Sequence, residues 1–368
     1  MAKVNRKNAA AGQAHVRPMV RIRFCFALVV LLVAAQSGSR ALASDADEAS
    51  RATRDLKEIL WAFPADTQTI MAARGPFKIE TADADAGPGP IKIHEMLQQV
   101  VLGLPPGFIR TEAGKDLAGC TVTVAVLGSK QFRSPRDLGA VHYVGASIIR
   151  LKNDASIVRK LAEGGDRSPR SDVERERIGG HDVLVVNYKA FKDTWTFFIS
   201  QPDARTIVCS SDRRYLNETL ARLQTRAATR ALPETSPEWP FVNIEQEFWA
   251  VRHYDRADAA EDPTSPLAGK LLEANTLDEF AVGIGCGYSR RDEQFQVAYL
   301  SKRPDAKPVV RDMFDLPPDH RLTSRECRDG GHVVQIVLDA HVADGDRTSP
   351  AALSALFVLQ SLGHATFF

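Results

Sequence analysis

The C-terminal part of the chain carries the residues with the spacing closest to that of a metal site. Asp339, His341, Asp344 and Asp346 follow one another where a predicted strand runs out into a loop. Carboxylates and an imidazole at this spacing could hold a divalent metal ion, so a hydrolase or another metal-dependent enzyme is one hypothesis. The alternative is a polar loop between a strand and a helix, because Asp and Gly are common turn residues. A calcium loop would also need a glutamate further on, and none follows.

A row of glycines marks a second candidate site, on a strand predicted over residues 279–288. Gly283, Gly285 and Gly287 alternate with larger residues, so they share one face of this strand. A strand face without side chains lets another group approach the backbone closely. A bound ligand or extended peptide is one candidate for that group, and a packed element of the same chain is the other. The glycine spacing is not a dinucleotide fingerprint, because no helix is predicted after it.

Two histidines stand at similar positions in the two halves of the chain. His181 and His332 each follow a Gly-Gly pair and begin a predicted strand. Each could act as a ligand or a base, and the alternative is a half-buried residue at the start of a strand.

The common catalytic patterns are absent from the sequence: no G-x-S-x-G, S-x-x-K, C-x-x-C or Walker loop occurs. His94-Glu95 begins like a zinc motif, but Gln98 stands where the second histidine is required. We therefore assign no catalytic residues and predict no cofactor.

The N-terminal region has the three parts of a secretory signal peptide. Basic residues that include Arg21 and Arg23 precede the apolar run Phe24–Ala35, and Ala41-Leu42-Ala43 follows it. A positive start, an apolar middle and an A-x-A site are the order of a cleaved signal peptide. Residues 1–43 are therefore predicted to be removed during export.

An uncleaved membrane anchor over residues 20–36 is the alternative. Its apolar run is shorter than the roughly 20 residues that a spanning helix needs. Met19 is also a candidate translation start, in which case residues 1–18 are a start-site artefact.

The charge of the protein depends on whether this leader is kept. The whole chain has a formal net charge of +1, whereas the 325 residues after Ala43 carry 40 basic and 46 acidic side chains, a net charge of −6. A mildly acidic exported protein has no bulk electrostatic reason to bind nucleic acid or anionic lipid. We predict no nucleic-acid partner, and a membrane partner only if the leader stays attached.

Four cysteines remain after the leader: Cys120, Cys209, Cys286 and Cys327. In an oxidising compartment they could form disulfides, and all three pairings are open. If pairs form, we expect each half of the chain to keep its own two. The alternative is that the thiols are reduced and buried in strands.

Hydrophobic periodicity predicts an α+β protein with antiparallel sheets and with helices packed on one face. Pro64 is expected to end the first helix, Gly75-Pro76 to break the first strand, and Ser211 or Asp212 to cap the third helix. Short links between residues 181 and 209 predict a meander. The predicted helices cover residues 45–63, 91–102, 211–228 and 349–362, and the predicted strands cover residues 68–74, 120–127, 141–152, 181–189, 194–200, 205–209, 246–254, 279–288, 293–301 and 332–339.

A proline-rich segment divides the chain into a first half over residues 44–230, a linker over residues 231–245 and a second half over residues 246–368. The two halves are candidates for an ancient duplication, because their Gly-Gly-His triplets lie 151 residues apart and precede similar strands. Coincidence is the alternative, since Gly-Gly turns before strands are common.

Two short segments resemble a type of secreted bacterial protein of unknown function. One is Phe63-Pro64-Ala65-Asp66-Thr67, a turn after a short helix, and the other is the strand and capped helix over Ile207–Leu216. The resemblance implies a signal peptide and antiparallel strands, and it brings no activity or site residues with it.

The sequence as a whole favours an exported, non-catalytic binding or structural protein of the bacterial envelope. The expected location is the periplasm, the cell surface or the outside of the cell. An enzyme that uses the Asp339–Asp346 loop is the alternative.

Overall fold

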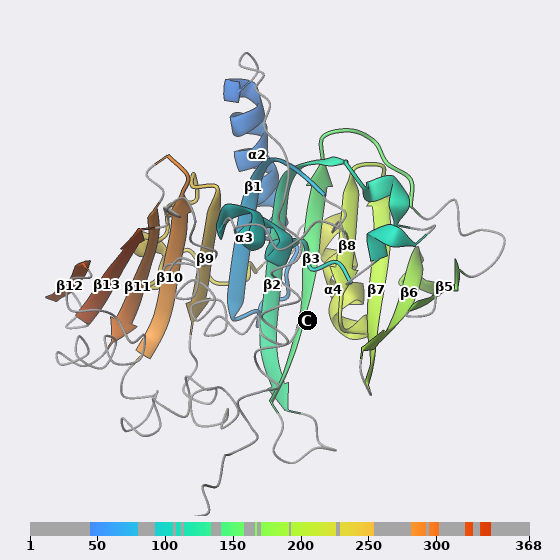
Figure 1. Cartoon of the computed structure of the whole chain (residues 1–368). Coiled ribbons are helices and arrows are strands. Elements are labelled where there is room, and N and C mark those ends of the chain that lie inside the picture. The colour runs from blue at the N-terminus through green and yellow to red at the C-terminus, as the bar shows by residue number, and fades with distance from the viewer. Residues whose placement is uncertain are drawn as a thin grey trace, which may run out of the picture.

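In the computed structural model, the described parts of the chain build one antiparallel sheet of thirteen strands (Figure 1). The order of the strands is β12-β13-β11-β10-β9-β1-β2-β3-β8-β7-β6-β5-β4. The structure describes residues 45–79, 93–105, 108–111, 114–133, 141–157, 166–167, 171–190, 193–225, 229–253, 281–291, 294–301, 321–326 and 332–339.

Every pair of neighbouring strands in the sheet is antiparallel, as the alternation of apolar residues and the short links predict. The strands are β1 (Thr69–Lys78), β2 (Thr121–Arg133), β3 (Val141–Leu151), β4 (Asp166–Arg167), β5 (Ser171–Ile178), β6 (His181–Ala190), β7 (Asp193–Asp203), β8 (Thr206–Ser210), β9 (Phe248–His253), β10 (Ala281–Ser289), β11 (Gln294–Ser301), β12 (Arg321–Glu326) and β13 (His332–Asp339).

Helices cover both faces of the sheet, so the prediction that they pack on one face is wrong. Side chains of β1 alternate between two cores, with Met71 in one and Ile70 in the other. Helix α3 (Ile93–Leu102) contributes to the first core. Helices α2 (Asp45–Ile59) and α4 (Arg213–Gln224) contribute to the second. Figure 1 accordingly shows α3 in front of the sheet and α4 behind it.

Strand β1 continues through Gly75-Pro76, where the sequence predicts a break. The strand absorbs the proline by a register shift between Arg74 and Phe77 against β2. Gly75 is required there, because an added Cβ atom would lie 2.0 Å from the carbonyl oxygen of Val122. The two backbones approach closely here, and β1 pairs with β2 on both sides of the proline.

A second irregularity changes which side chains of β2 share a face. The alternation of the sequence predicts that Val122, Val124 and Val126 point the same way. A register shift between Val122 and Val124 against β3 places Val122 in the core of α3, while Val124 and Val126 lie in the core of α2 and α4. A single bulged residue thus reverses the face of one valine.

The meander between residues 181 and 209 is confirmed, and it is longer than predicted. Strand β5 precedes β6 in the chain and pairs with it, and β12 precedes β13 and pairs with it in the same way. Both strands were missed because their many charged residues hide the alternation. Helix α4 then begins at Arg213, and Asp212 is its N-cap, whose Oδ1 accepts a hydrogen bond from the Tyr215 backbone N–H at 2.7 Å.

The two halves of the chain share one sheet through the pairing of β1 with β9. Counted outward from this pair, each half begins with three strands in chain order, β1-β2-β3 on one side and β9-β10-β11 on the other. Strands β6 and β5 lie further out in the first half, and β13 and β12 in the second, but only the first half inserts β8 and β7 before them. This order agrees with a duplication, which stays a prediction, as do the boundaries of the halves.

Within the described residues, no helix combines the length and the apolar character that crossing a membrane requires. The leader over residues 1–43 and the helix predicted over residues 349–362 lie outside those residues.

Candidate binding site

A charged pocket of about 480 Å³ opens between α2 and the adjacent ends of β3, β7 and β8. It lies on the face of the sheet that α2 and α4 cover, beyond the apolar core. Every residue that lines it is charged: Arg51, Arg54, Asp55, Glu58, Arg150, Asp203 and Arg205.

Helix α2 reaches the pocket with one of its two stripes. Its apolar stripe, which includes Ala52, Leu56 and Ile59, is buried in the core against the sheet. Its charged stripe consists of Arg51, Arg54, Asp55 and Glu58, which are spaced three, one and three residues apart and therefore share one side of the helix. Packing of the first stripe fixes the direction in which the second one points.

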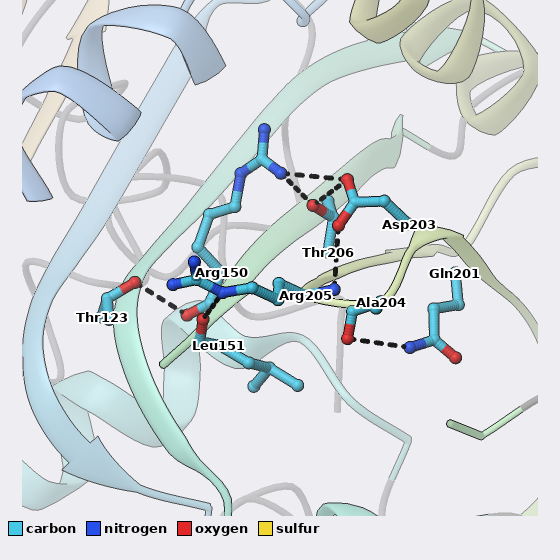
Figure 2. A network of polar contacts seen from close by, with 8 residues as sticks. All are labelled: Thr123, Arg150, Leu151, Gln201, Asp203, Ala204, Arg205 and Thr206. Atoms are coloured by element: carbon cyan, nitrogen blue, oxygen red, sulfur yellow. Dashed lines mark hydrogen bonds and ion pairs between the residues drawn. The ribbon is translucent and has the colours of Figure 1, made fainter. Parts of the chain in front are cut away.

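The floor of the pocket is an ion pair between strands (Figure 2). Arg150 of β3 donates from Nη1 to Oδ2 of Asp203 at 3.2 Å, and it also contacts the hydroxyl of Thr206, its cross-strand neighbour on β8. Asp203 accepts two more hydrogen bonds, from Thr206 Oγ1 at 2.6 Å and from the backbone N–H of Arg205 at 2.8 Å. The carboxylate of Asp203 is therefore well satisfied.

Arg205 stands beside this pair in the tight turn between β7 and β8. Its Nε donates to the carbonyl oxygen of Leu151 at 3.0 Å, which ties the turn to the end of β3. Gln201 supports the other side of the turn by donating from Nε2 to the carbonyl oxygens of Ala155 and Ala204. Figure 2 shows the contact of Arg205 with Leu151 and the contact of Gln201 with Ala204.

The two aspartates of the pocket have pKa values that move in opposite directions. Burial raises the pKa of Asp55 above its ordinary value of 3.8, with the support of Glu58 and against the opposing charges of Arg150, Arg205 and Arg51. Burial alone would also raise the pKa of Asp203, but the hydrogen bonds from Thr206 and Arg205 and the charge of Arg150 bring it below 3.8.

Three of the four arginines keep donors available to a ligand. Arg51 and Arg54 are exposed and make no hydrogen bond or ion pair to any residue in the described ranges. Arg205 uses Nε toward Leu151, and its terminal nitrogens donate to no described residue. The pocket therefore combines one internal ion pair with three arginines that still have free N–H groups.

The metal set predicted at the end of the second half is only partly within the described residues. Asp339 is the last residue of β13 and pairs with Gln294 of β11. His341, Asp344 and Asp346 lie outside the described residues, and Asp339 is described only through its backbone. Across the described ranges, no group of three or more candidate ligands gathers. The metal site stays a prediction.

The glycine row is approached closely, as the sequence predicts, and the approaching group belongs to the chain itself. A Cβ atom added at Gly283 would lie 1.9 Å from Oε1 of Glu238, and one added at Gly287 would lie 1.8 Å from Oε1 of Gln246. At Gly285 the nearest atom is Cγ2 of Val242, at 3.0 Å. The segment predicted as a linker thus packs on β10, and ligand binding at these glycines stays a prediction that the contacts do not support.

Glu238 anchors this segment over the glycine row. The residue is completely buried, and its Oε1 lies 2.7 Å from Nδ1 of His253 on β9, whose side chain is 42 % exposed. No sequence pattern indicates the pair, because its members lie fifteen positions apart and neither belongs to a motif.

The three described cysteines are free thiols. Cys209 and Cys286 are buried, and Cys120 is half-buried and donates from Sγ to the carbonyl oxygen of Asp116 at 3.1 Å. A bridge between Cys120 and Cys209 is therefore not formed, in line with the reduced, buried alternative. Cys327 lies outside the described residues.

The two Gly-Gly-His histidines lie on different strands and do not share a site. His181 pairs with Ile178 at the start of β6, and its Nε2 lies 2.8 Å from Nε2 of Gln224 on α4. His332 begins β13 and pairs with Ser301. Both are half-buried residues at strand starts.

The charged pocket was missed because its parts are far apart in the sequence. The charged side of α2 and the turn around Asp203 are visible separately, and each alone is typical of a solvated surface. Only the pairing of β3 with β8 places Arg150 beside them.

Comparisons with known proteins assign no family to the chain. No protein-family model matches the sequence, and no curated protein is similar to it. Two crystal forms of TP0453 are similar in structure, each with a TM-score of 0.42. Crystal form I is 10 % identical, and the alignment covers 82 % of this chain and 96 % of TP0453. Crystal form III is 8 % identical, and the alignment covers 80 % of this chain and 97 % of TP0453. MucB in complex with MucA(peri) has a TM-score of 0.11 at 8 % identity, with 79 % of this chain and 92 % of MucB covered. At these values, the likeness indicates no function.

Proposed function

We propose that the protein is an exported, non-catalytic binding protein of the bacterial envelope and that the pocket between α2 and the β3, β7 and β8 ends is its binding site. The predicted leader over residues 1–43 is the reason to propose that the protein is exported. The pocket carries the binding role, because three of its arginines keep N–H donors that bond to no described residue, beside a rigid frame of paired strands.

The architecture of the pocket suits binding. Arg150 and Asp203 are fixed by strand pairing and by hydrogen bonds from the β7–β8 turn. Helix α2 is fixed by its buried apolar stripe. The strand ends and the helix that carry the pocket residues are thus fixed before a ligand arrives, which favours recognition.

The location is tested by fractionation of cells that express the full chain from its own start. Mass spectrometry of the N-terminus should find a chain that begins at Ser44 in an envelope or extracellular fraction. An intact leader on protein in the membrane fraction would favour the anchor instead. An intact leader on protein in the cytoplasm would contradict export.

A further inference from the structure

The uncommitted arginines of the pocket indicate the chemistry of its ligand. Arg51 and Arg54 come from one side of α2, and Arg205 comes from the β7–β8 turn across the pocket. A guanidinium group is planar and presents paired N–H donors that match the oxygens of carboxylates and phosphates. Three such groups around one open space form a site for an anion.

The internal ion pair does not reduce this capacity. Asp203 is already neutralised by Arg150, with which it forms a hydrogen-bonded pair at 3.2 Å. The remaining carboxylates that line the pocket are Asp55 and Glu58, on the same side of α2 as the two arginines. Three free guanidinium groups thus face two carboxylates, which leaves an excess of one positive charge.

Protonation of Asp55 increases this excess. Burial is the largest effect and raises the pKa of its carboxyl group. The neighbouring Glu58 acts in the same direction, and the charges of Arg150, Arg205 and Arg51 oppose it. An arriving anion adds further negative charge beside it and therefore favours the protonated carboxyl group. With Asp55 protonated, three guanidinium groups and one carboxylate would remain beside the Arg150–Asp203 pair.

The number of donors favours phosphate over carboxylate. A phosphate monoester carries about −1.5 to −2 charges at pH 7 and three acceptor oxygens, whereas a carboxylate has two oxygens and one charge. The volume of about 480 Å³ exceeds the need of a bare ion and falls among small-molecule sites, which span roughly 300–1,000 Å³.

Resting on the proposed binding function, we infer that the pocket recognises the phosphate group of a phosphate monoester, held between Arg51, Arg54 and Arg205. The monoester reaches the site either on a small soluble molecule or on the headgroup of a lipid. Both sources offer the same group to the same three arginines.

Calorimetric titration of the full chain with glycerol 3-phosphate tests the soluble source, and co-flotation with phosphatidylcholine vesicles that contain phosphatidic acid tests the lipid source. We expect one binding site per chain for at least one of these two ligands. The double variant Arg51→Gln and Arg54→Gln should weaken that binding at least about tenfold, because each lost charged hydrogen bond contributes to affinity. Both arginines are exposed, so the variant keeps the core intact.

Arg290→Gln with Arg291→Gln is the matched control, since it removes two exposed arginines from the turn after β10 and changes the net charge equally. It should bind as the unaltered chain does. Equal weakening in both double variants would show non-specific attraction and overturn the site. Succinate binding as tightly as glycerol 3-phosphate would overturn the phosphate assignment. Binding of neither glycerol 3-phosphate nor phosphatidic acid would overturn both the site and the phosphate assignment. Fractionation reports on export independently, so a failure here is distinct from a failure of the proposed location.

Discussion

The hydroxyl oxygens of Thr67 and Tyr215 lie 2.7 Å apart in the interior, although 148 residues separate them in the chain. Thr67 belongs to the turn before β1, and Tyr215 belongs to the first turn of α4. These are the two segments on which the resemblance to secreted bacterial proteins depends. Lys130 reinforces the junction, because its ammonium group pairs with Asp66 and lies 5.9 Å from the centre of the Tyr215 ring.

Replacing Tyr215 with Phe should destabilise the fold by about 1–2 kcal/mol, because the hydroxyl of Thr67, which is 3 % exposed, loses its partner. Urea unfolding of the variant and the unaltered chain measures the difference. Tyr188→Phe is the control, because the hydroxyl of Tyr188 makes no hydrogen bond in the described part of the chain; it should change stability by less than about 0.5 kcal/mol. Equal effects of the two variants would contradict the role of the junction.

Alanine substitutions in the glycine row should lower the free energy of unfolding by different amounts. Gly283→Ala should destabilise by about 1–3 kcal/mol, because the new methyl group meets the completely buried Glu238 and disturbs its contact with His253. Gly287→Ala should cost less, because it meets the far end of the half-buried Gln246 side chain, which can move aside. Chemical denaturation of both variants gives the order, and the reverse order would mean that the segment does not rest on β10 through Glu238.

The two aspartates of the pocket should change stability with pH in opposite directions. The pKa of Asp203 is lower in the folded chain than the ordinary 3.8, so its contribution to stability is present above that value and is lost as pH falls through the folded pKa. The pKa of Asp55 is raised, so its ionisation reduces stability as pH rises through the folded pKa.

These opposite pH dependences are tested with the variants Asp203→Asn and Asp55→Asn. The free energy of unfolding of each variant is compared with that of the unaltered chain at acidic and neutral pH. Asp203→Asn should be destabilising at neutral pH, and its effect should shrink in acid. Asp55→Asn should be neutral or stabilising at neutral pH. The same sign for both variants at neutral pH would contradict the assigned environments.

Thiol labelling of the native chain should distinguish the described cysteines. Cys120 is half-buried and should react with N-ethylmaleimide first. Cys286 is buried, which raises the pKa of its thiol to about 12, and Cys209 is buried with a pKa raised still further. Both should react only when urea unfolds the chain. Mass spectrometry of peptides identifies the labelled residues, and fast native labelling of Cys286 would contradict its burial.

Local patterns in the sequence were enough to find most elements of the sheet. The apolar runs of β3, β6 and β13 are dense enough to specify strands without help from the rest of the chain. Asp212 has the side chain and the position of a helix cap, and α4 begins directly after it. The glycine row correctly predicted a close approach to β10, because a strand face without side chains has few other uses.

Pairing and packing across the sheet decided the rest. Gly75-Pro76 predicts the end of a strand, yet the carbonyl of Val122 approaches so closely that β1 continues with a shifted register. The side of the sheet that each helix covers depends on which apolar faces remain open after all thirteen strands have paired. Residue order alone does not contain that information.

Composition and periodicity predicted a leader, which lies outside the described residues, and they determined the strand-rich α+β class and most helix and strand positions, because each depends on residues near one another in the chain. Tertiary structure alone decided that one sheet unites both halves, that helices cover both of its faces, and that Arg51, Arg150 and Arg205 line one pocket. The physical reason is that strand pairing and burial act between residues far apart in the sequence, and only the folded chain shows which of them meet.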